Sequence, residues 1–170
     1  MRKIIVFVII CCMGMMGVYA QETDARSFVK RYSKMEGFTG ITINKVGIRL
    51  TMLLAKISNP KDDVSFLSKV NNVQILTLSA EGYEKNIQSF EEAFAEFCKT
   101  AGYEQTMQSE DAESRKEIFC KITEDRIVGL IILNKEADSV GMICIDGRFD
   151  PQDIESALSG KVPHIMGSNK

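Results

Sequence analysis

The sequence predicts an α+β fold, with helices packed on one face of a mostly antiparallel sheet of about six strands. The first observation is that residues 115–149 alternate apolar and polar side chains between short polar turns, which predicts three consecutive antiparallel strands. The second is that several earlier segments space their apolar residues three or four positions apart, as amphipathic helices do. The third is that no internal repeat or low-complexity tract divides the chain, so one domain is expected.

The N-terminus has the build of a secretory signal peptide. Arg2 and Lys3 precede an apolar run at residues 4–13, and mixed, mostly short side chains follow up to Ala20. Small or short residues at the end of such a segment fit the signal peptidase pocket. We therefore expect cleavage between Ala20 and Gln21.

Two other roles of this leader are disfavoured. The apolar run is shorter than the roughly 20 residues that a membrane span needs. Neither Cys11 nor Cys12 follows the small residue that a lipoprotein signal requires. The chain is therefore expected to divide into a signal peptide at 1–20, an α+β domain at 21–160 and a flexible tail at 161–170.

The composition excludes one class of partner. The 170 residues are 45% hydrophobic and 26% charged, with a formal net charge of -2. Lysine and glutamate residues are interspersed along the predicted helices, whereas nucleic-acid binding needs a clustered basic face. We expect no nucleic-acid partner and no membrane span.

The first helix is predicted after Thr23 or Asp24, either of which can cap it. The segment Phe38 to Lys45 then alternates as a strand does. A second helix is expected from Val46 to Ile57, before an Asn-Pro pair, because proline cannot continue the helical hydrogen-bond ladder. Its apolar stripe comprises Val46, Leu50, Leu53, Leu54 and Ile57.

Residues 64–70 favour two more helical turns, and residues 73–79 a second strand. The order of strand, helix and strand predicts that these two strands run parallel if they are neighbours. The longest helix is expected at 82–101. Its face carries Phe90, Phe94 and Phe97, which we interpret as covering the sheet rather than lining a ligand groove.

A strand at 103–109 leads into the three-stranded meander. Hairpin turns are predicted at 124–126 and 135–139, where polar residues interrupt the alternation. The middle strand of the meander, at 128–133, has apolar residues at both odd and even positions, so that both of its faces are apolar, which is typical of a central strand. Asp150 followed by proline and a further acid then has the pattern of a helix start.

Three cysteines follow the leader: Cys98, Cys120 and Cys144. Cys120 and Cys144 are predicted on strands separated by a third strand, about 9.6 Å apart, beyond the roughly 7 Å at which a disulfide can close. Cys98 lies on the apolar face of its helix, so its pairing with either of the others stays open. Because all three positions face the predicted core, we interpret them as buried thiols.

Asp146, Asp150 and Asp153 are the candidate metal ligands, with Gly147 between them. Carboxylates clustered between a strand and a helix supply the oxygen ligands that Ca²⁺ takes. The interpretation we favour is that Asp146 and Gly147 shape a turn, while Asp150 and Asp153 cap the helix. The sequence therefore assigns no metal site and no cofactor, and calcium is kept as a candidate.

No motif of reaction chemistry is found, and no catalytic residue is assigned. His164, the one histidine, falls in the predicted tail, whereas catalytic groups need rigid support. The triplet 159–161 resembles the end of a phosphate loop but lacks the earlier glycine. The alternative function, a small periplasmic hydrolase, would depend on scattered carboxylates such as Glu117 and Glu124.

The last strand and its flank carry the most specific sequence pattern. Residues 143–158 contain Cys144, Ile145, Asp146 and Gly147, followed by Phe149, Asp150, Ile154 and Leu158. With the leader, the early helix that runs into Gly37 and the strand at 41–45, this pattern resembles the domain-of-unknown-function family 4252. The resemblance implies an exported Gram-negative envelope protein with one α+β domain, and it supplies no catalytic residues.

These observations favour a periplasmic or secreted protein that is a noncatalytic binding or regulatory module. An exposed sheet face or edge strand would hold its partner, an unknown envelope protein or ligand. The hydrolase is the alternative, and the oligomeric state is left open.

Overall fold

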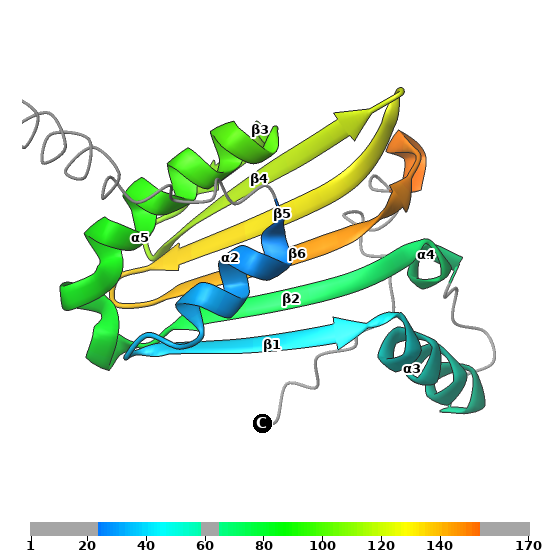
Figure 1. The fold of residues 1–170 in the computed structure, drawn as a ribbon, viewed down its shortest axis with the longest axis horizontal. Helices are drawn as coiled ribbons and strands as arrows, with labels where there is room; N and C mark the ends of the chain where they lie inside the picture. The colour runs from blue at the N-terminus through cyan, green and yellow to red at the C-terminus, as the bar shows by residue number, and fades with distance from the viewer. Residues whose placement is uncertain (1–23, 59–64, 154–170) are drawn as a thin grey trace, which may run out of the picture.

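The computed structural model describes residues 24–58 and 65–153. Its strands are β1 (Phe38–Asn44), β2 (Val70–Leu78), β3 (Glu104–Glu110), β4 (Ser114–Thr123), β5 (Arg126–Glu136) and β6 (Val140–Phe149). They form one sheet in the order β1-β2-β6-β5-β4-β3 (Figure 1), and every neighbouring pair is antiparallel. The predicted α+β class and antiparallel six-stranded sheet are confirmed.

The helices are α2 (Ala25–Tyr32), α3 (Lys45–Ser58), α4 (Ser65–Ser68) and α5 (Ala80–Ala101). Asp24 caps α2, since its carboxylate accepts the backbone N–H groups of Arg26 and Ser27 at 3.3 Å. Gly102 ends α5 in the left-handed conformation, with φ 76°. Figure 1 shows α2 and α5 on one face of the sheet, and α3 and α4 at one end of it.

The meander forms as predicted, with β5 between β4 and β6. Glu124 and Asp125 both have positive φ angles, 51° and 60°, which a tight two-residue hairpin turn requires. Arg126, predicted in that turn, is already the first residue of β5.

The prediction that the first two strands run parallel is wrong. β1 and β2 pair antiparallel, with Phe38 opposite Leu78 and Asn44 opposite Asn72. The reason is that α3 and α4 stay at the end of the sheet where β1 stops (Figure 1). The chain therefore re-enters the sheet from that same end instead of crossing its face.

Phenylalanine rings fill the space between the helices and the sheet. Phe28 of α2 stacks on Phe97 of α5 with ring centroids 4.6 Å apart, and Phe90 is 6.1 Å from Phe28. Beneath them Leu133 and Met142 are fully buried. The phenylalanine stripe of α5 thus covers the sheet, as predicted, and α2 and α5 share one core.

Four of the five residues in the predicted apolar stripe of α3 face away from the sheet. Ile48 is 5% exposed and packs against the sheet together with the half-buried Met52. The outward residues are Val46, Leu50, Leu53 and Leu54, which are 74%, 56%, 57% and 55% exposed. We call these four residues the outer stripe.

Several predictions fall outside the described residues: the leader at 1–20, the C-terminal helix beyond Asp153, the tail, the 159–161 triplet and His164. Residues 151–153 form the helical turn expected after Asp150. Over residues 24–58 and 65–153, no helix combines the length and apolar character needed to cross a membrane.

Candidate functional site

Six apolar side chains form a continuous row across the sheet, on the face opposite α2 and α5. Strand register aligns them, because Ile75 of β2 lies opposite both Ile41 and Ile143, and Ile132 lies opposite both Ile143 and Ile118. Since alternate residues of a strand point to opposite faces, the neighbours of these residues pack under the helices instead. This isoleucine row comprises Ile41, Ile75, Ile143, Ile132, Ile118 and Met107, one from each strand.

Only one end of this face is covered by the described helices. Ile48 and Met52 of α3, with Phe66 and Leu67 of α4, join a buried cluster there. At the two edges of the sheet, Ile41 and Met107 are 51% and 52% exposed. The row is therefore exposed at its two ends, half-buried at Ile75, Ile143 and Ile132, and buried at Ile118. The members outside both buried clusters are Ile41, Ile75, Ile143 and Met107.

A polar row borders the isoleucine row on the side away from α3. Thr39 lies opposite Thr77, and Lys116 lies between Asn134 and Ser109. The full row is Thr39, Thr77, Gly141, Asn134, Lys116 and Ser109. An apolar strip with a polar margin has the layout of a protein interface, in which a dry centre is rimmed by polar groups.

One hollow opens on this face beside β3. Its volume is about 220 Å³, below the roughly 300–1,000 Å³ of small-molecule pockets, so it fits a side chain better than a cofactor. Thr106 sits on its rim, and its hydroxyl donates to the Ile118 carbonyl at 3.2 Å. The lining residues are Thr106, Met107, Ile118, Cys120, Ile122, Ile127 and Pro151.

The three cysteines are free and buried, as predicted. Cys98 and Cys144 lie in the core under the helices, and Cys120 lies on the opposite face. Burial raises the pKa of Cys98 to about 12 and also raises the pKa of Cys144. A nucleophile must be a thiolate near neutral pH, so neither of these two thiols is configured as one.

Asp150 and Asp153 are drawn together by a lysine. Lys69 Nζ donates to Asp153 Oδ2 at 2.6 Å and to Asp150 Oδ2 at 3.2 Å. The Asp150 backbone N–H also donates to Asp153 Oδ2 at 2.7 Å, which is the capping role predicted for Asp153. The hydrogen bond from Lys69 lowers the pKa of Asp153.

Asp146 lies apart from that pair, on the helix-covered side beside Gln74. Burial raises the pKa of Asp146, and the Gln74 amide is near enough to oppose part of the rise. Neither polar atom of that wholly buried amide has a hydrogen-bond partner of good geometry among the described residues. No three metal-binding side chains gather in residues 24–58 and 65–153, and calcium at Asp146, Asp150 and Asp153 stays an untested candidate.

The two carboxylates named for a hydrolase are far apart. Glu117 is 5% exposed and pairs with Arg115 at 2.7 Å and Lys135 at 3.4 Å. Glu124 is exposed in the β4–β5 turn, seven positions further along. At about 3.3 Å per strand residue they are roughly 23 Å apart, whereas acid pairs that cleave glycosides lie about 5–10 Å apart.

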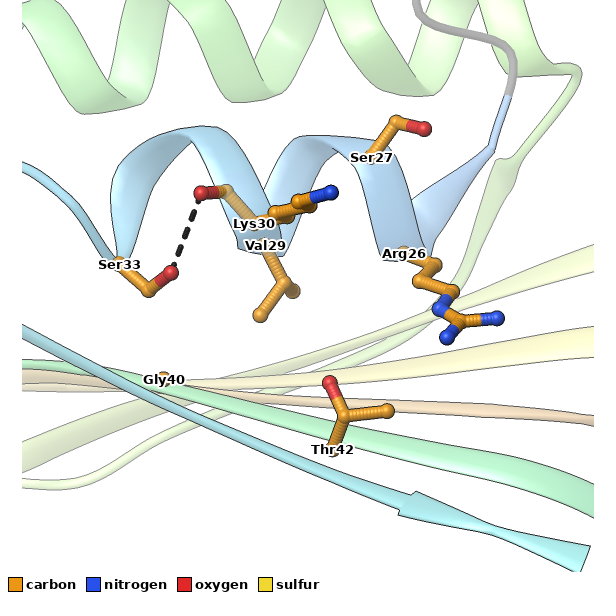
Figure 2. A pocket seen from close by; sticks show the side chains of 7 residues that line it. All are labelled: Arg26, Ser27, Val29, Lys30, Ser33, Gly40 and Thr42. Carbon is orange, nitrogen blue, oxygen red and sulfur yellow. Dashed lines mark hydrogen bonds between the residues drawn. The ribbon is translucent and has the colours of Figure 1, made fainter.

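A polar cleft of about 330 Å³ lies between α2 and β1 (Figure 2). Figure 2 shows Arg26 extending from α2 toward the sheet, while Ser33 donates to the Lys30 carbonyl at 3.1 Å. The two cationic side chains of the cleft, those of Arg26 and Lys30, are exposed and therefore hydrated. The cleft is lined by Arg26, Ser27, Val29, Lys30, Ser33, Gly40 and Thr42.

An acidic hollow of about 420 Å³ lies where the β3–β4 and β5–β6 turns meet. The Asp111 carboxylate accepts hydrogen bonds from the backbone N–H groups of Glu113 and Ser114, at 3.0 and 2.8 Å. Its carboxylate therefore shapes a turn. Neither polar hollow matches the extent of the isoleucine row, which is the strongest candidate site.

The sequence pointed to a sheet face but not to this row. The row could have been anticipated from three strand segments that have apolar residues at both odd and even positions: 73–76, 130–133 and 142–145. Such strands have two apolar faces, and the helices predicted here could cover only one.

Residues 32–157 match the family described as Domain of unknown function (DUF4252). No curated protein matches the chain.

Proposed function

The chain belongs to the DUF4252 family, a domain of unknown function, and on that premise we propose that it is a noncatalytic module of the cell envelope that binds a partner protein on the isoleucine row. The observation that carries this proposal is the exposure of that row at both sheet edges, at Ile41 and Met107.

The physical support is the cost of leaving such a strip in water. Burying apolar surface contributes about 25 cal/mol per Å², and large contiguous apolar patches on soluble proteins mark interaction sites. The row crosses all six strands, so a partner that covers it would contact elements from residue 41 to residue 143.

The state of the reactive side chains supports a noncatalytic role. Cys98 and Cys144 have raised pKa values, and Glu117 is paired with two cations. Groups committed to packing and ion pairs are not free for proton transfer or nucleophilic attack.

We also propose that the protein is exported, with cleavage after Ala20. The support is the three-part pattern of residues 1–20, namely a basic start, an apolar run and a mixed segment with short side chains at Val18 and Ala20.

Photo-crosslinking in the cell envelope tests the binding face. A benzophenone amino acid at position 41 or 107 should give one discrete adduct larger than the protein, because these side chains would lie in the interface. The matched controls are positions 39 and 109, which are exposed on the same strands and the same face, in the polar row.

Charge substitutions provide the second arm. Ile41→Asp and Met107→Asp should abolish the adduct formed from the other position, whereas Thr39→Asp and Ser109→Asp should leave it intact. Equal crosslinking from the row and from its polar neighbours would contradict the proposal. An adduct of twice the protein's own mass would show that the row binds a second copy of this chain and not a different protein.

A further inference from the structure

Helix α3 is apolar on two sides, and only one side is used by the fold. Ile48 and Met52, four residues apart, pack against the end of the sheet. The outer stripe, defined above, points away from the sheet, and each of its side chains is more than half exposed. Single exposed apolar residues are ordinary, but four on one 14-residue helix form a stripe that requires an explanation.

The rotation of α3 about its axis is fixed, so the outer stripe does not turn inward. Asn44 Oδ1 accepts the backbone N–H groups of Val46 at 3.1 Å and Gly47 at 3.0 Å. Lys45 Nζ donates to Asn71 Oδ1 at 3.2 Å, which ties the first turn to β2. With Ile48 seated in its cluster, these contacts hold the stripe in its outward position.

The charge of α3 differs in sign from that of the chain. The helix carries Lys45, Arg49 and Lys56 and no acidic residue, whereas the formal charge of the chain is -2. Arg49 is exposed, three positions from Val46 and four from Leu53, so it borders the outer stripe. Apolar residues bordered by basic ones are the pattern of helices that lie in the interface of an anionic membrane.

We propose that α3 docks on the surface of an anionic lipid bilayer, with the outer stripe among the acyl chains and Arg49 at the headgroups. This site is separate from the isoleucine row, and the helix lies on the bilayer without spanning it.

The shape of the site favours a bilayer over a protein partner. Figure 1 shows α3 projecting at the end of the sheet, beyond the point where β1 stops. The outer stripe lines none of the three hollows described above. A narrow apolar stripe that projects from the fold and is bordered by an exposed cation has the layout of a helix that lies in the membrane interface, where binding depends on buried apolar area and on attraction to anionic lipids.

Vesicle sedimentation with the chain 21–170 tests this assignment. The protein should sediment with vesicles of phosphatidylcholine and phosphatidylglycerol, and much less with phosphatidylcholine alone. Leu50→Ser with Leu53→Ser should lower the partition coefficient about tenfold or more, because both residues lose their apolar contact with the acyl chains. Arg49→Glu should remove most of the dependence on phosphatidylglycerol and on salt.

The matched control is Ile41→Ser with Ile122→Ser, which removes two other apolar residues, 51% and 60% exposed, outside α3. This variant should sediment like the wild type, even where it loses the crosslinked partner, so the two proposals fail independently. Thermal melting of each variant confirms that it is folded.

Two results would overturn membrane docking. One is sedimentation that is absent, or that is unchanged by the Leu50 and Leu53 substitutions in the folded variant. The other is a dimer in sedimentation velocity that the same substitutions dissociate, which would assign the outer stripe to contact between copies.

Discussion

The thiols of this protein are removed from solvent by the same packing that forms its core. Cys144 is wholly buried and Cys98 is 5% exposed, and the desolvation of their charged forms raises both pKa values. Their role is therefore that of small apolar side chains, in the same close-packed cluster as the phenylalanine rings.

Native Cys98 and Cys144 should not react with a thiol reagent at pH 8. The reason is that the reagent attacks the thiolate, which burial suppresses. Absorbance after addition of Ellman's reagent to the chain 21–170 should show at most the reaction of Cys120 before unfolding, and of all three cysteines in guanidinium chloride. Rapid native labelling at position 98, identified by mass spectrometry, would contradict this.

Lys69 links the two aspartates that follow β6, and the stability it contributes should depend on pH. The pKa of Asp153 is lowered, so its contribution is present above the unfolded pKa and is lost as pH falls through the lower folded value. The pKa of Lys69 is raised, so its contribution is lost as pH rises through the higher folded value. The pairing should therefore act between about pH 4 and pH 10.

Lys69→Gln should lower Tm within that window by no more than about 3 °C, because the pair is partly solvated. The difference from the wild type should shrink toward pH 3. Lys85→Gln is the matched control, since Lys85 pairs with Glu36 at a far more exposed site. A difference that grows on acidification would show that the sign assigned to this pairing is wrong.

At the scale of elements, one close contact sets the position of α5. A Cβ added to Gly82 would lie 2.6 Å from the Gly37 Cα, so the start of α5 and the turn before β1 approach as only glycines allow. Asn86 secures the same contact, with Nδ2 donating to the Glu36 carbonyl at 3.0 Å.

Gly82→Ala should therefore lower the free energy of unfolding, by roughly 1–3 kcal/mol, because backbone atoms must move apart to admit the methyl group. Urea denaturation measures the change. Gly141→Ala is the control, since a Cβ at that strand position meets nothing within 4 Å. Equal stability of the two variants would show that the contact is not tight.

Element types were predictable from periodicity, but the orientation of α3 was not. Its sequence has two apolar stripes, and the longer one, including Leu50 and Leu53, faces solvent. The Asn44 cap at the end of β1 orients the helix so that Ile48 and Met52 face the sheet, and this cap depends on the three-dimensional position of β1. The antiparallel pairing of β1 and β2 was missed for a related reason, since sequence order does not show that a helix stays at the end of a sheet.

At the scale of the whole molecule, the α+β class, the meander and the burial of the cysteines followed from local patterns. The isoleucine row did not, because it exists only once β6 lies between β2 and β5. Ile75 and Ile143 are far apart in sequence, and the register that aligns them is set by long-range pairing.

Export makes a prediction about the intact protein. The form isolated from the envelope should begin at Gln21, because the short side chains of Val18 and Ala20 fit the signal peptidase pocket. N-terminal peptide mass spectrometry measures this, and Ala20→Asp should leave the uncut chain to accumulate. A native protein that still carries residues 1–20 would contradict export by this route.

The central place of β6 also governs when the protein can fold during its synthesis. β1 and β2 form one ribbon and β3, β4 and β5 another, and the sheet joins them through β6, which follows the other five described strands in the chain. A nascent chain stopped at residue 139 would hold two unjoined ribbons with open edges, so the sheet cannot be completed until β6 has been made. That delay would suit the export proposed above, because the sheet stays incomplete while the first five described strands are made.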